Sequence, residues 1–339
     1  MAQPNDDFGP VGVLGGGSWG TSLAQLAATN GFRVIQWMRD AQRADEQNRC
    51  HENRIYLPDI PLSPAIEAIT DLKRVGKECR LILVVVPSQS LRSVLYELGA
   101  HLDGGHLLVH GVKGLETGTF KRMSEILREE TPCRQLGVLS GPNLAREVAM
   151  GQPSASVVAS RYEAVIEATR VALTGPTFRV YGNADLVGVE IGGALKNVLA
   201  IASGVVYGLG FGDNTKALLL TRGIAEIARL GSHLGANAST FSGLSGIGDL
   251  VATCFSPLSR NFQVGQKLAQ GQSLTTIAHS TNQVAEGVKT TLSVYEYAKR
   301  HSIDMPIMEA VYRMLYEQAK PAEVLKDLMS ITRFPYEHS

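Results

Sequence analysis

The segment at residues 11–20 reads VGVLGGGSWG, an apolar run that leads directly into three consecutive glycines. The apolar run predicts a strand, and the residues after the glycines predict a helix with one apolar face. Gly15, Gly17 and Gly20 fit the spacing G-x-G-x-x-G. Between a strand and a helix, with a second strand following, this spacing is typical of the turn that binds a dinucleotide. An ordinary turn between a strand and a helix is the alternative interpretation.

Each glycine of this spacing has an expected role. Gly15 permits the tight turn, Gly17 allows a pyrophosphate to approach the backbone, and Gly20 lets the helix pack closely on the strand. Free N–H groups at the start of the helix would then hold the phosphates.

The residues after the second predicted strand bear on the choice between NAD and NADP. An acidic residue there binds the ribose 2′-hydroxyl of NAD, whereas an arginine favours the 2′-phosphate of NADP. Arg39 comes first and Asp40 follows it. Arg39 therefore favours NADP(H), and the adjacent Asp40 leaves NAD(H) open. A solvent-exposed arginine without a ligand is the alternative for Arg39.

Short apolar runs alternate with amphipathic segments through the first half of the chain. This alternation predicts an α/β fold with a Rossmann-like, doubly wound parallel sheet. The predicted strands are 11–14, 32–38, 81–86, 107–110, 135–140, 154–159 and 177–181, and the predicted helices include 18–29, 88–98 and 119–129.

Helical periods replace this alternation from about residue 185, and one of them covers 215–230. We therefore expect two domains, a dinucleotide-binding domain at 1–185 and an all-helical substrate and catalytic domain at 186–339. No low-complexity linker joins the two halves, so they should pack tightly, with the active site in the cleft between them.

The composition excludes several classes of protein. The chain has 339 residues, of which 44% are hydrophobic, and this excludes a wholly disordered chain. Lys and Arg number 32, as do Asp and Glu, so the net charge is zero and a broad nucleic-acid-binding surface is not expected. The four cysteines are scattered without metal-ligand spacing, which predicts reduced thiols and no metal site.

One apolar stretch, at residues 186–210, is long enough to span a membrane. It contains Glu190, Lys196, Asn197 and several glycines, which a lipid-facing helix would not tolerate cheaply. The N-terminal residues lack the basic and apolar regions of a signal peptide. We expect a buried helix in a cytoplasmic protein that has no membrane span.

Two clusters of candidate residues follow predicted strands. Lys113 comes after the strand at 107–110, and Gly141 and Asn143 come after the strand at 135–140. Ligands of open α/β sheets bind at the carboxyl ends of the strands, so these residues are expected near a ligand. The alternatives are a solvent-exposed loop for Lys113 and a helix cap for Asn143.

Lys196 and Asn197 stand inside an apolar helical segment, after Gly192 and Gly193. A lysine in that setting either extends to the surface or faces a cleft. In a cleft, desolvation lowers its pKa towards neutrality, which enables it to donate and accept a proton. The two glycines would open space for a ligand beside it.

The last cluster lies further along the helical half. Asp249 and Thr253 share one helix face at i, i+4. Ser259 can cap the next helix, whose free N–H groups would form a phosphate-sized anion pocket with Arg260 and Asn261. A capped surface helix without a ligand is the alternative.

Taken in order, these motifs resemble those of the NAD(P)-dependent glycerol-3-phosphate dehydrogenase family, of the soluble bacterial type. The resemblance spans about residues 10–330. Gly16 departs from the family pattern, in which alanine is common, and we expect this change to be harmless. The motifs are Gly-Gly-Gly-Ser-Trp-Gly-Thr (15–21), Val-Lys-Gly-Leu-Glu (112–116), Ser-Gly-Pro-Asn (140–143), Ala-Leu-Lys-Asn-Val (194–198), Gly-Ile-Gly-Asp-Leu (246–250) and Ser-Arg-Asn (259–261).

The resemblance implies a reaction and its ligands. The reaction is reversible hydride transfer between NADP(H) or NAD(H) and C2 of dihydroxyacetone phosphate, which yields sn-glycerol 3-phosphate for glycerophospholipid synthesis. Two phosphorylated ligands and no metal are then expected. The family also suggests a homodimer.

The resemblance also implies roles for residues. Lys196 would accept and donate the proton, Lys113 would polarise the carbonyl group, and Asp249 would be the carboxylate of the site. Together with the motifs, it predicts substrate binding by Lys113, Gly141, Asn143, Lys196, Asp249, Thr253, Ser259, Arg260 and Asn261. It predicts cofactor binding by Gly15, Gly17, Ser18, Trp19, Gly20, Arg39, Lys113, Ala145, Arg260, Val284 and Glu286.

Two other hypotheses remain open at this point. Another β-hydroxyacid-type dehydrogenase of the same architecture could bind a carboxylate at Arg260. A redox-sensing Rossmann protein could bind NAD(H) and regulate a partner, but a lysine inside an apolar helix and a neutral chain do not favour it.

Overall fold

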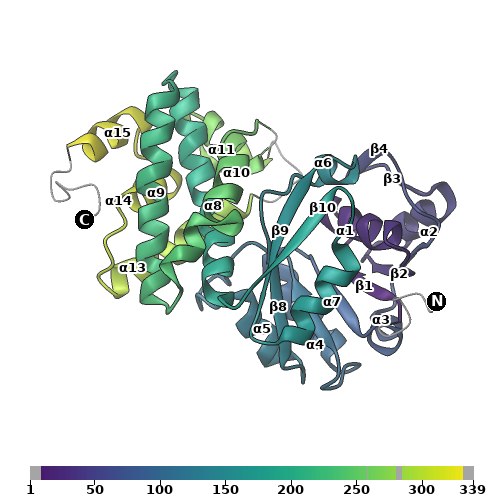
Figure 1. Ribbon diagram of the computed structural model, residues 1–339. Coiled ribbons are helices and arrows are strands. Elements are labelled where there is room, and N and C mark those ends of the chain that lie inside the picture. Colours follow the sequence, from purple (N-terminus) through teal and green to yellow (C-terminus); the bar gives the residue numbers. More distant parts are fainter. Residues whose placement is uncertain (1–8, 258, 280–284, 331–339) are drawn as a thin grey trace.

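The computed structural model describes residues 9–257, 259–279 and 285–330 of the chain. Its first half is built around one eight-stranded sheet, with the strand order β10-β9-β8-β7-β6-β1-β2-β5 (Figure 1). These strands are β1 (Val11–Leu14), β2 (Val34–Trp37), β5 (Ile66–Ile69), β6 (Leu81–Val84), β7 (Leu107–His110), β8 (Gln135–Ser140), β9 (Ser154–Ser160) and β10 (Phe178–Asn183). A separate two-stranded sheet pairs β3 (Glu52–Asn53) with β4 (Leu57–Pro61).

Helices cover both faces of the large sheet, because its strands carry apolar side chains on both sides. In β6, Leu81 and Leu83 belong to the core under one face, and Ile82 and Val84 to the core under the other. The helices of this half are α1 (Ser18–Thr29), α2 (Ala41–Cys50), α3 (Leu72–Glu78), η1 (Ser88–Ser90), α4 (Leu91–Gly99), α5 (Met123–Glu130), α6 (Ala145–Ala149) and α7 (Glu163–Leu173). Helices α1, α6 and α7 pack on the first of these faces, and α3, α4 and α5 on the second.

The predicted α/β class is therefore confirmed, with one difference in the sheet. Within the eight-stranded sheet, all neighbours are parallel except β8 and β9, which pair antiparallel, with Val138 opposite Ala159. The segment between β8 and β9 contains only the short α6, and the chain returns alongside β8 without crossing the sheet. An antiparallel pair needs no crossover, so this connection can be short.

From Leu186 onwards the described residues form helices and no strand. These are α8 (Leu186–Gly208), α9 (Asp213–His233), η2 (Ala238–Ser242), η3 (Leu244–Gly248), α10 (Asp249–Cys254), α11 (Arg260–Ala269), α12 (Leu274–His279), α13 (Glu286–Arg300), α14 (Pro306–Tyr316) and α15 (Pro321–Met329). The helical half and the α/β half lie side by side in Figure 1, with α8 at the centre of the helical half.

Helix α8 contains 23 residues and is long and apolar enough to cross a membrane, but its most apolar window is entirely buried inside the protein. The α9, α10, α11, α13 and α14 helices all pack against it. The expectation of a buried core helix is thus confirmed, and α8 provides a rigid support for the side chains that project from it.

Close packing of α8 on α11 depends on two glycines. A Cβ atom on Gly204 would come within 2.0 Å of the carbonyl oxygen of Phe262, and one on Gly265 within 1.9 Å of that of Ile201. Neither position can hold a larger residue unless the two backbones move apart. The start of α11 is thereby held close to the middle of α8.

Two element predictions were wrong in detail. The helix predicted at 119–129 begins only at Met123, because Phe120 has a φ of +60° and Leu115 pairs with Arg122 across a turn. The prediction also omitted α2, α3 and the strands between them. The N-cap residues of these two helices are Asp40 and Asp71, and each aspartate side chain accepts a hydrogen bond from a backbone N–H of the first turn.

Candidate active site

Five polar side chains converge at the carboxyl ends of the sheet strands. Lys113 follows β7, and Ser140 is the last residue of β8. Lys196 projects from the middle of α8, and Asp249 and Thr253 project from α10. A π-helical turn, η3, runs directly into α10 and orients Asp249 towards the sheet; such turns are frequent at functional sites. The structure therefore unites clusters that lie far apart in the sequence.

Asp249 stands between the two lysines. Its Oδ2 atom accepts a hydrogen bond of 2.6 Å from Lys113 Nζ, and its Oδ1 atom pairs with Lys196 Nζ. Lys196 Nζ also donates to Thr253 Oγ1 at 2.7 Å, and Lys113 Nζ donates to the carbonyl oxygen of Gly141 at 3.2 Å. An ammonium group has three N–H bonds, so each lysine has one left for a ligand.

Burial and charge set the protonation of this group. Lys196 is 6% exposed, and desolvation lowers its pKa to about 8, with Asp249 opposing the shift and Lys113 adding to it. Burial alone would raise the pKa of Asp249, but the positive charges of Lys113 and Lys196 outweigh it and hold that pKa below its ordinary value. The aspartate stays ionised, and the cluster carries two positive charges against one negative.

A series of side-chain amide hydrogen bonds connects the backbone of Lys113 to the helical half. Asn197 Nδ2 donates to the carbonyl oxygen of Lys113 at 3.1 Å, and Asn261 Nδ2 donates to Asn197 Oδ1 at 2.9 Å. Asn261 Oδ1 in turn accepts from the backbone N–H of Gly287 at 3.0 Å. The side chain of Asn261 thus joins α11 to α8 and α13.

The loop after β8 is fixed by Asn143. Its Oδ1 atom accepts from Ser156 Oγ at 2.5 Å, and its Nδ2 atom donates to the carbonyl oxygen of Ala155 at 3.0 Å. The alternative of a helix cap was wrong, because Leu144 occupies the N-cap of α6. Gly141 sits where a Cβ atom would come within 2.8 Å of that same carbonyl oxygen.

The start of α11 has the predicted cap. Ser259 is the N-cap residue, and its side chain accepts from the backbone N–H of Phe262 at 3.3 Å. Arg260 is the first residue of the helix and is exposed. The N–H groups of this first turn and the Arg260 side chain are the parts of the predicted anion pocket that the structure describes.

The glycine-rich turn has the geometry expected of a dinucleotide site. A Cβ atom on Gly15 would lie 2.7 Å from the carbonyl oxygen of Val85, and one on Gly20 would lie 2.1 Å from that of Gly15, so both positions need glycine. No atom lies within 4 Å of a Cβ atom placed on Gly17, which is the N-cap residue of α1 and provides no side-chain cap. The N–H groups at the start of α1 are therefore available to phosphate oxygens.

Trp19 supports this interpretation independently. Its Nε1 atom is buried and has no hydrogen-bond partner among the described residues. A Cβ atom on Gly111 would come within 3.0 Å of it, so the ring edge abuts the segment that leads to Lys113. A buried donor without a partner costs about 1–3 kcal/mol, which a bound ligand can recover.

The remaining predicted cofactor residues lie around this turn. Ser18 Oγ donates to the carbonyl oxygen of Tyr56 at 2.7 Å, and Ser22 Oγ donates to that of Ala145 at 2.7 Å. The Glu286 carboxylate, at the start of α13, accepts from the Ser88 backbone N–H at 3.1 Å and from its hydroxyl group. Val284 lies outside the described residues.

Arg39 and Asp40 differ in their surroundings. Arg39 follows β2, is exposed and has no hydrogen bond or ion pair in the described part of the chain. Asp40 caps α2 by accepting from the N–H of Arg43 at 3.2 Å. Arg43, which sequence reasoning missed, donates to the carbonyl oxygen of Gly16 at 2.9 Å and stacks on Tyr56. A basic residue on α2 next to the glycine-rich turn gave no signal in the sequence.

Of the two glycines predicted to open space beside Lys196, one needs correction. Gly192 does not open space for a ligand, because a Cβ atom there would lie 2.7 Å from the Ser245 carbonyl oxygen and it serves packing on η3. Gly193 does face the site: its nearest neighbours are Ser140 Oγ and the side chain of Lys113. No group of three or more potential metal ligands occurs in the described ranges.

Comparisons with known proteins agree with this geometry. The family described as NAD-dependent glycerol-3-phosphate dehydrogenase N-terminus matches residues 10–166, and its C-terminus counterpart matches residues 185–326. A glycerol-3-phosphate dehydrogenase [NAD(P)+] of Ectopseudomonas mendocina is 48% identical over 94% of this chain and 94% of its own. Its counterpart in Thermobifida fusca is 46% identical over 96% and 98%.

Solved structures give the same result. The crystal structure of a glycerol-3-phosphate dehydrogenase from Coxiella burnetii is similar to this chain with a TM-score of 0.91 and 36% sequence identity. The similarity covers 95% of this chain and 99% of that one.

Proposed function

This chain belongs to the NAD(P)-dependent glycerol-3-phosphate dehydrogenase family, and on that premise we propose which of its side chains carry the reaction. The reaction interconverts dihydroxyacetone phosphate and sn-glycerol 3-phosphate with NAD(P)H as coenzyme. One observation supports the assignment most strongly: two lysines share one buried aspartate at the carboxyl ends of the strands.

We propose that Lys196 transfers the proton. The dihydronicotinamide ring, when bound, supplies a hydride to C2 of dihydroxyacetone phosphate. The oxygen on C2 then needs a proton, and Lys196 has one N–H bond left after Asp249 and Thr253. A pKa of about 8 keeps both protonation states accessible near neutral pH, which a group that donates and accepts the same proton requires.

Lys113 has a different proposed role. It is paired with the other oxygen of Asp249 and with the carbonyl oxygen of Gly141, and its third N–H bond is directed to the substrate. A second fixed positive charge polarises the C2 carbonyl group and stabilises the negative charge that develops on its oxygen. Asp249 holds both ammonium groups in place and, by staying ionised, keeps Lys196 from losing its proton too easily.

The start of α11 would bind the phosphate group of the substrate. Ser259, Arg260 and Asn261 provide a helix N-terminus with a guanidinium beside it, which suits a phosphate. The amide chain from Asn261 through Asn197 to Lys113 fixes the separation of the phosphate site and the reacting carbon. Gly141, Asn143 and Thr253 border the substrate in this arrangement.

We propose that the cofactor binds at the glycine-rich turn, between β1 and α1. The open backbone at Gly17, the uncapped start of α1 and the unpartnered Nε1 atom of Trp19 support a pyrophosphate and nicotinamide there. Arg39 would bind the 2′-phosphate of NADP. The other proposed contacts are Gly15, Ser18, Gly20, Lys113, Ala145, Arg260, Val284 and Glu286.

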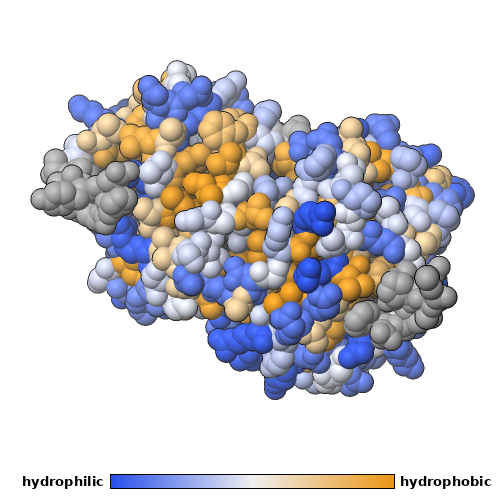
Figure 2. All heavy atoms as spheres, viewed as in Figure 1, coloured by the Kyte–Doolittle hydropathy of each residue, from blue (hydrophilic) through white to orange (hydrophobic). Residues whose placement is uncertain are grey.

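We further propose a cytoplasmic homodimer with a dinucleotide-binding domain at 1–185 and a catalytic domain at 186–339. Figure 2 shows hydrophobic residues gathered on the helical half. Tyr207, Phe211, Leu218 and Phe255 on this half are each more than 40% exposed, and the Lys216 ammonium lies within 6 Å of the Tyr207 and Phe255 rings. Apolar surface of this kind is typical of a subunit interface. Light scattering of the purified protein tests the dimer.

Steady-state kinetics of the purified protein test the proposed substrate. We expect it to oxidise NADPH with dihydroxyacetone phosphate, and to lose at least ~100-fold in kcat/KM with dihydroxyacetone, since two or more charged hydrogen bonds to the phosphate are lost. Absence of turnover with both NADPH and NADH would reject the function. A kcat/KM for dihydroxyacetone equal to that for dihydroxyacetone phosphate would reject the phosphate site at the start of α11.

A further inference from the structure

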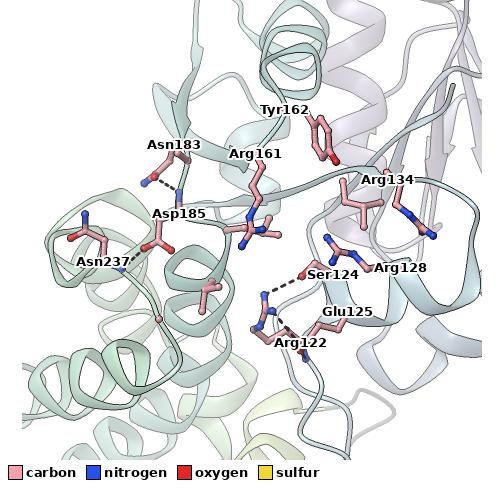
Figure 3. Close-up of a pocket in the computed structure, with 15 residues that line it drawn as sticks. Arg122, Ser124, Glu125, Arg128, Arg134, Arg161, Tyr162, Asn183, Asp185 and Asn237 are labelled. Carbon is pink, nitrogen blue, oxygen red and sulfur yellow. Dashed lines mark hydrogen bonds and ion pairs between the residues drawn. The ribbon is translucent and has the colours of Figure 1, made fainter. Parts of the chain in front are cut away.

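A cavity of about 440 Å³ lies between the two halves of the molecule (Figure 3). Lys113, Lys196 and Asp249 are not among the residues that line it. Its walls come from α5, the start of β8, the residues between β9 and α7, the segment from the end of β10 to the start of α8, and the residues after α9. None of the residues assigned above to substrate or cofactor lines it. Its volume falls within the range of small-ligand sites, roughly 300–1,000 Å³.

Four arginines line this cavity, which we call the arginine pocket: Arg122, Arg128, Arg134 and Arg161. Figure 3 shows the guanidinium groups of Arg122, Arg128 and Arg161 turned towards a common space. The side chains of Arg128 and Arg161 are exposed and have no hydrogen bond or ion pair within the described ranges, and the side chain of Arg134 makes only a 3.4 Å bond to a backbone carbonyl.

The acidic groups near the cavity are already engaged. Asp185 accepts from the N–H groups of Gly188 and Asn237 and from Thr240. Glu125 accepts from the backbone N–H of Arg122 at 2.8 Å. Counting also the buried Glu190 that pairs with Arg122, three carboxylates stand against four arginines, so the net charge around the cavity is +1. Both Glu125 and Glu190 pair with Arg122, which leaves the guanidinium groups of Arg128, Arg134 and Arg161 without an acidic partner among the described residues and suits an anionic phosphate monoester.

A buried carboxylate fixes the side chain of Arg122. Its Nη1 atom pairs with the buried Glu190 at 2.5 Å, and Glu190 also accepts from Ser124 and contacts His110 at 3.0 Å. The partners of Glu190 outweigh its desolvation and lower its pKa to about 2, so this carboxylate stays charged. One wall of the cavity is therefore preorganised before any ligand arrives.

Apolar side chains complete the lining. Leu136, Leu186 and Val187 form part of the wall, and the ring of Tyr162 stands at its edge beside Arg134. A bare phosphate ion would leave this surface and much of the volume unused. A small organic group attached to the phosphate would cover it.

We propose that the arginine pocket is a second ligand site that binds a small organic phosphate monoester. The phosphate pairs with Arg128 and Arg161, since guanidinium groups match phosphate oxygens in bidentate fashion. The organic part packs on Leu136, Leu186 and Tyr162. The ligand contacts α5 and the start of α8 at once, and so bridges the two halves of the molecule.

Phenyl phosphate is a suitable probe, because it combines one phosphate monoester with one apolar ring. Its binding to the intact protein is measured by isothermal titration calorimetry and compared with that of inorganic phosphate. The test variant is Arg128→Gln/Arg161→Gln. Its matched control is Arg33→Gln/Arg179→Gln, which loses the same charge at two exposed positions outside the pocket lining. Arg260→Gln reports on binding at the proposed substrate phosphate site.

We expect millimolar or tighter binding to the unaltered protein, a loss of ~10-fold or more in the test variant, and a change below about twofold in the control and in Arg260→Gln. The kcat of the test variant should stay within about twofold of the original, which verifies its fold. The proposal is overturned if phenyl phosphate does not bind, if its binding is lost only in Arg260→Gln, or if the control variant loses as much as the test variant. Binding of inorganic phosphate as tight as that of phenyl phosphate would overturn the organic part of the proposal.

Discussion

At the scale of single residues, Lys196 shows how neighbours tune one buried side chain. Desolvation pulls its pKa down, whereas Asp249 pulls it up, and the result is a pKa of about 8 rather than the ordinary value of 10.5. Sequence reasoning anticipated the direction of this shift, because Lys196 stands in an apolar helical segment. It did not anticipate that Lys113 shares the same carboxylate, since 136 positions separate that pair.

Arg39 is the residue on which the choice of cofactor depends. For Arg39→Ala we expect the KM for NADPH to rise ~10-fold or more, because a charged hydrogen bond to the 2′-phosphate is lost, with little change in the KM for NADH. Steady-state kinetics with both cofactors measure this. Arg33→Ala, an exposed arginine just before the same strand, is the control and should change neither value. Equal losses for both cofactors in Arg39→Ala would contradict the 2′-phosphate contact.

Gly16 also illustrates the limits of residue-level prediction. The replacement of alanine by glycine was expected to be harmless because the position faces a tight turn. In the structure a Cβ atom on Gly16 would lie 2.8 Å from the side chain of Met38, so an alanine at this position would require Met38 to shift. The carbonyl oxygen of Gly16 also accepts from Arg43 and Asn53, two contacts that no local pattern indicates.

At the scale of elements, strands with continuous apolar runs were the most predictable. The strands 11–14, 107–110 and 135–140 are observed with the predicted bounds. The short strands β3, β4 and β5 were missed, because runs of two to five residues with prolines and charges have little periodicity. The late start of α5 reflects the turn at Phe120, whose backbone conformation a non-glycine residue rarely adopts.

The crossing of α8 and α11 gives a prediction about stability. Gly265→Ala should lower the free energy of unfolding by about 2 kcal/mol or more, because the added Cβ atom meets the Ile201 carbonyl oxygen at 1.9 Å. Urea denaturation measures this. Gly104→Ala is the matched control: no atom lies within 4 Å of its added Cβ, and a change below about 1 kcal/mol is expected. Equal values for the two variants would show that the helices can separate without cost.

At the scale of the whole molecule, the active site exists only where the two halves meet. The α/β half supplies Lys113, and the helical half supplies Lys196 and Asp249. The halves are joined by the bond from Asn197 to Lys113 and by the contact of Glu286 with Ser88. The sequence predicted the fold class, the candidate residues and the helical character of the second half. It could not predict the distances between these residues, which depend on how the halves pack.

The zero net charge of the chain does not imply an even distribution of charge over the molecule. Zero net charge argued against a nucleic-acid surface, and the structure shows that positive charge is concentrated instead of absent. It gathers at the lysine cluster and in the arginine pocket. Anionic ligands can therefore be bound without a basic surface, because two or three preorganised cations and a helix N-terminus suffice.

The central claim is that Lys196 transfers the proton, and the kinetics of Lys196→Ala test it most directly. We expect kcat for dihydroxyacetone phosphate reduction to fall at least ~100-fold, the low end for lost acid–base catalysis, while NADPH binding measured by fluorescence is unchanged. Lys289→Ala, an exposed lysine on α13, should keep full activity. A Lys196→Ala variant that binds NADPH and turns over at near-normal rates would contradict the claim.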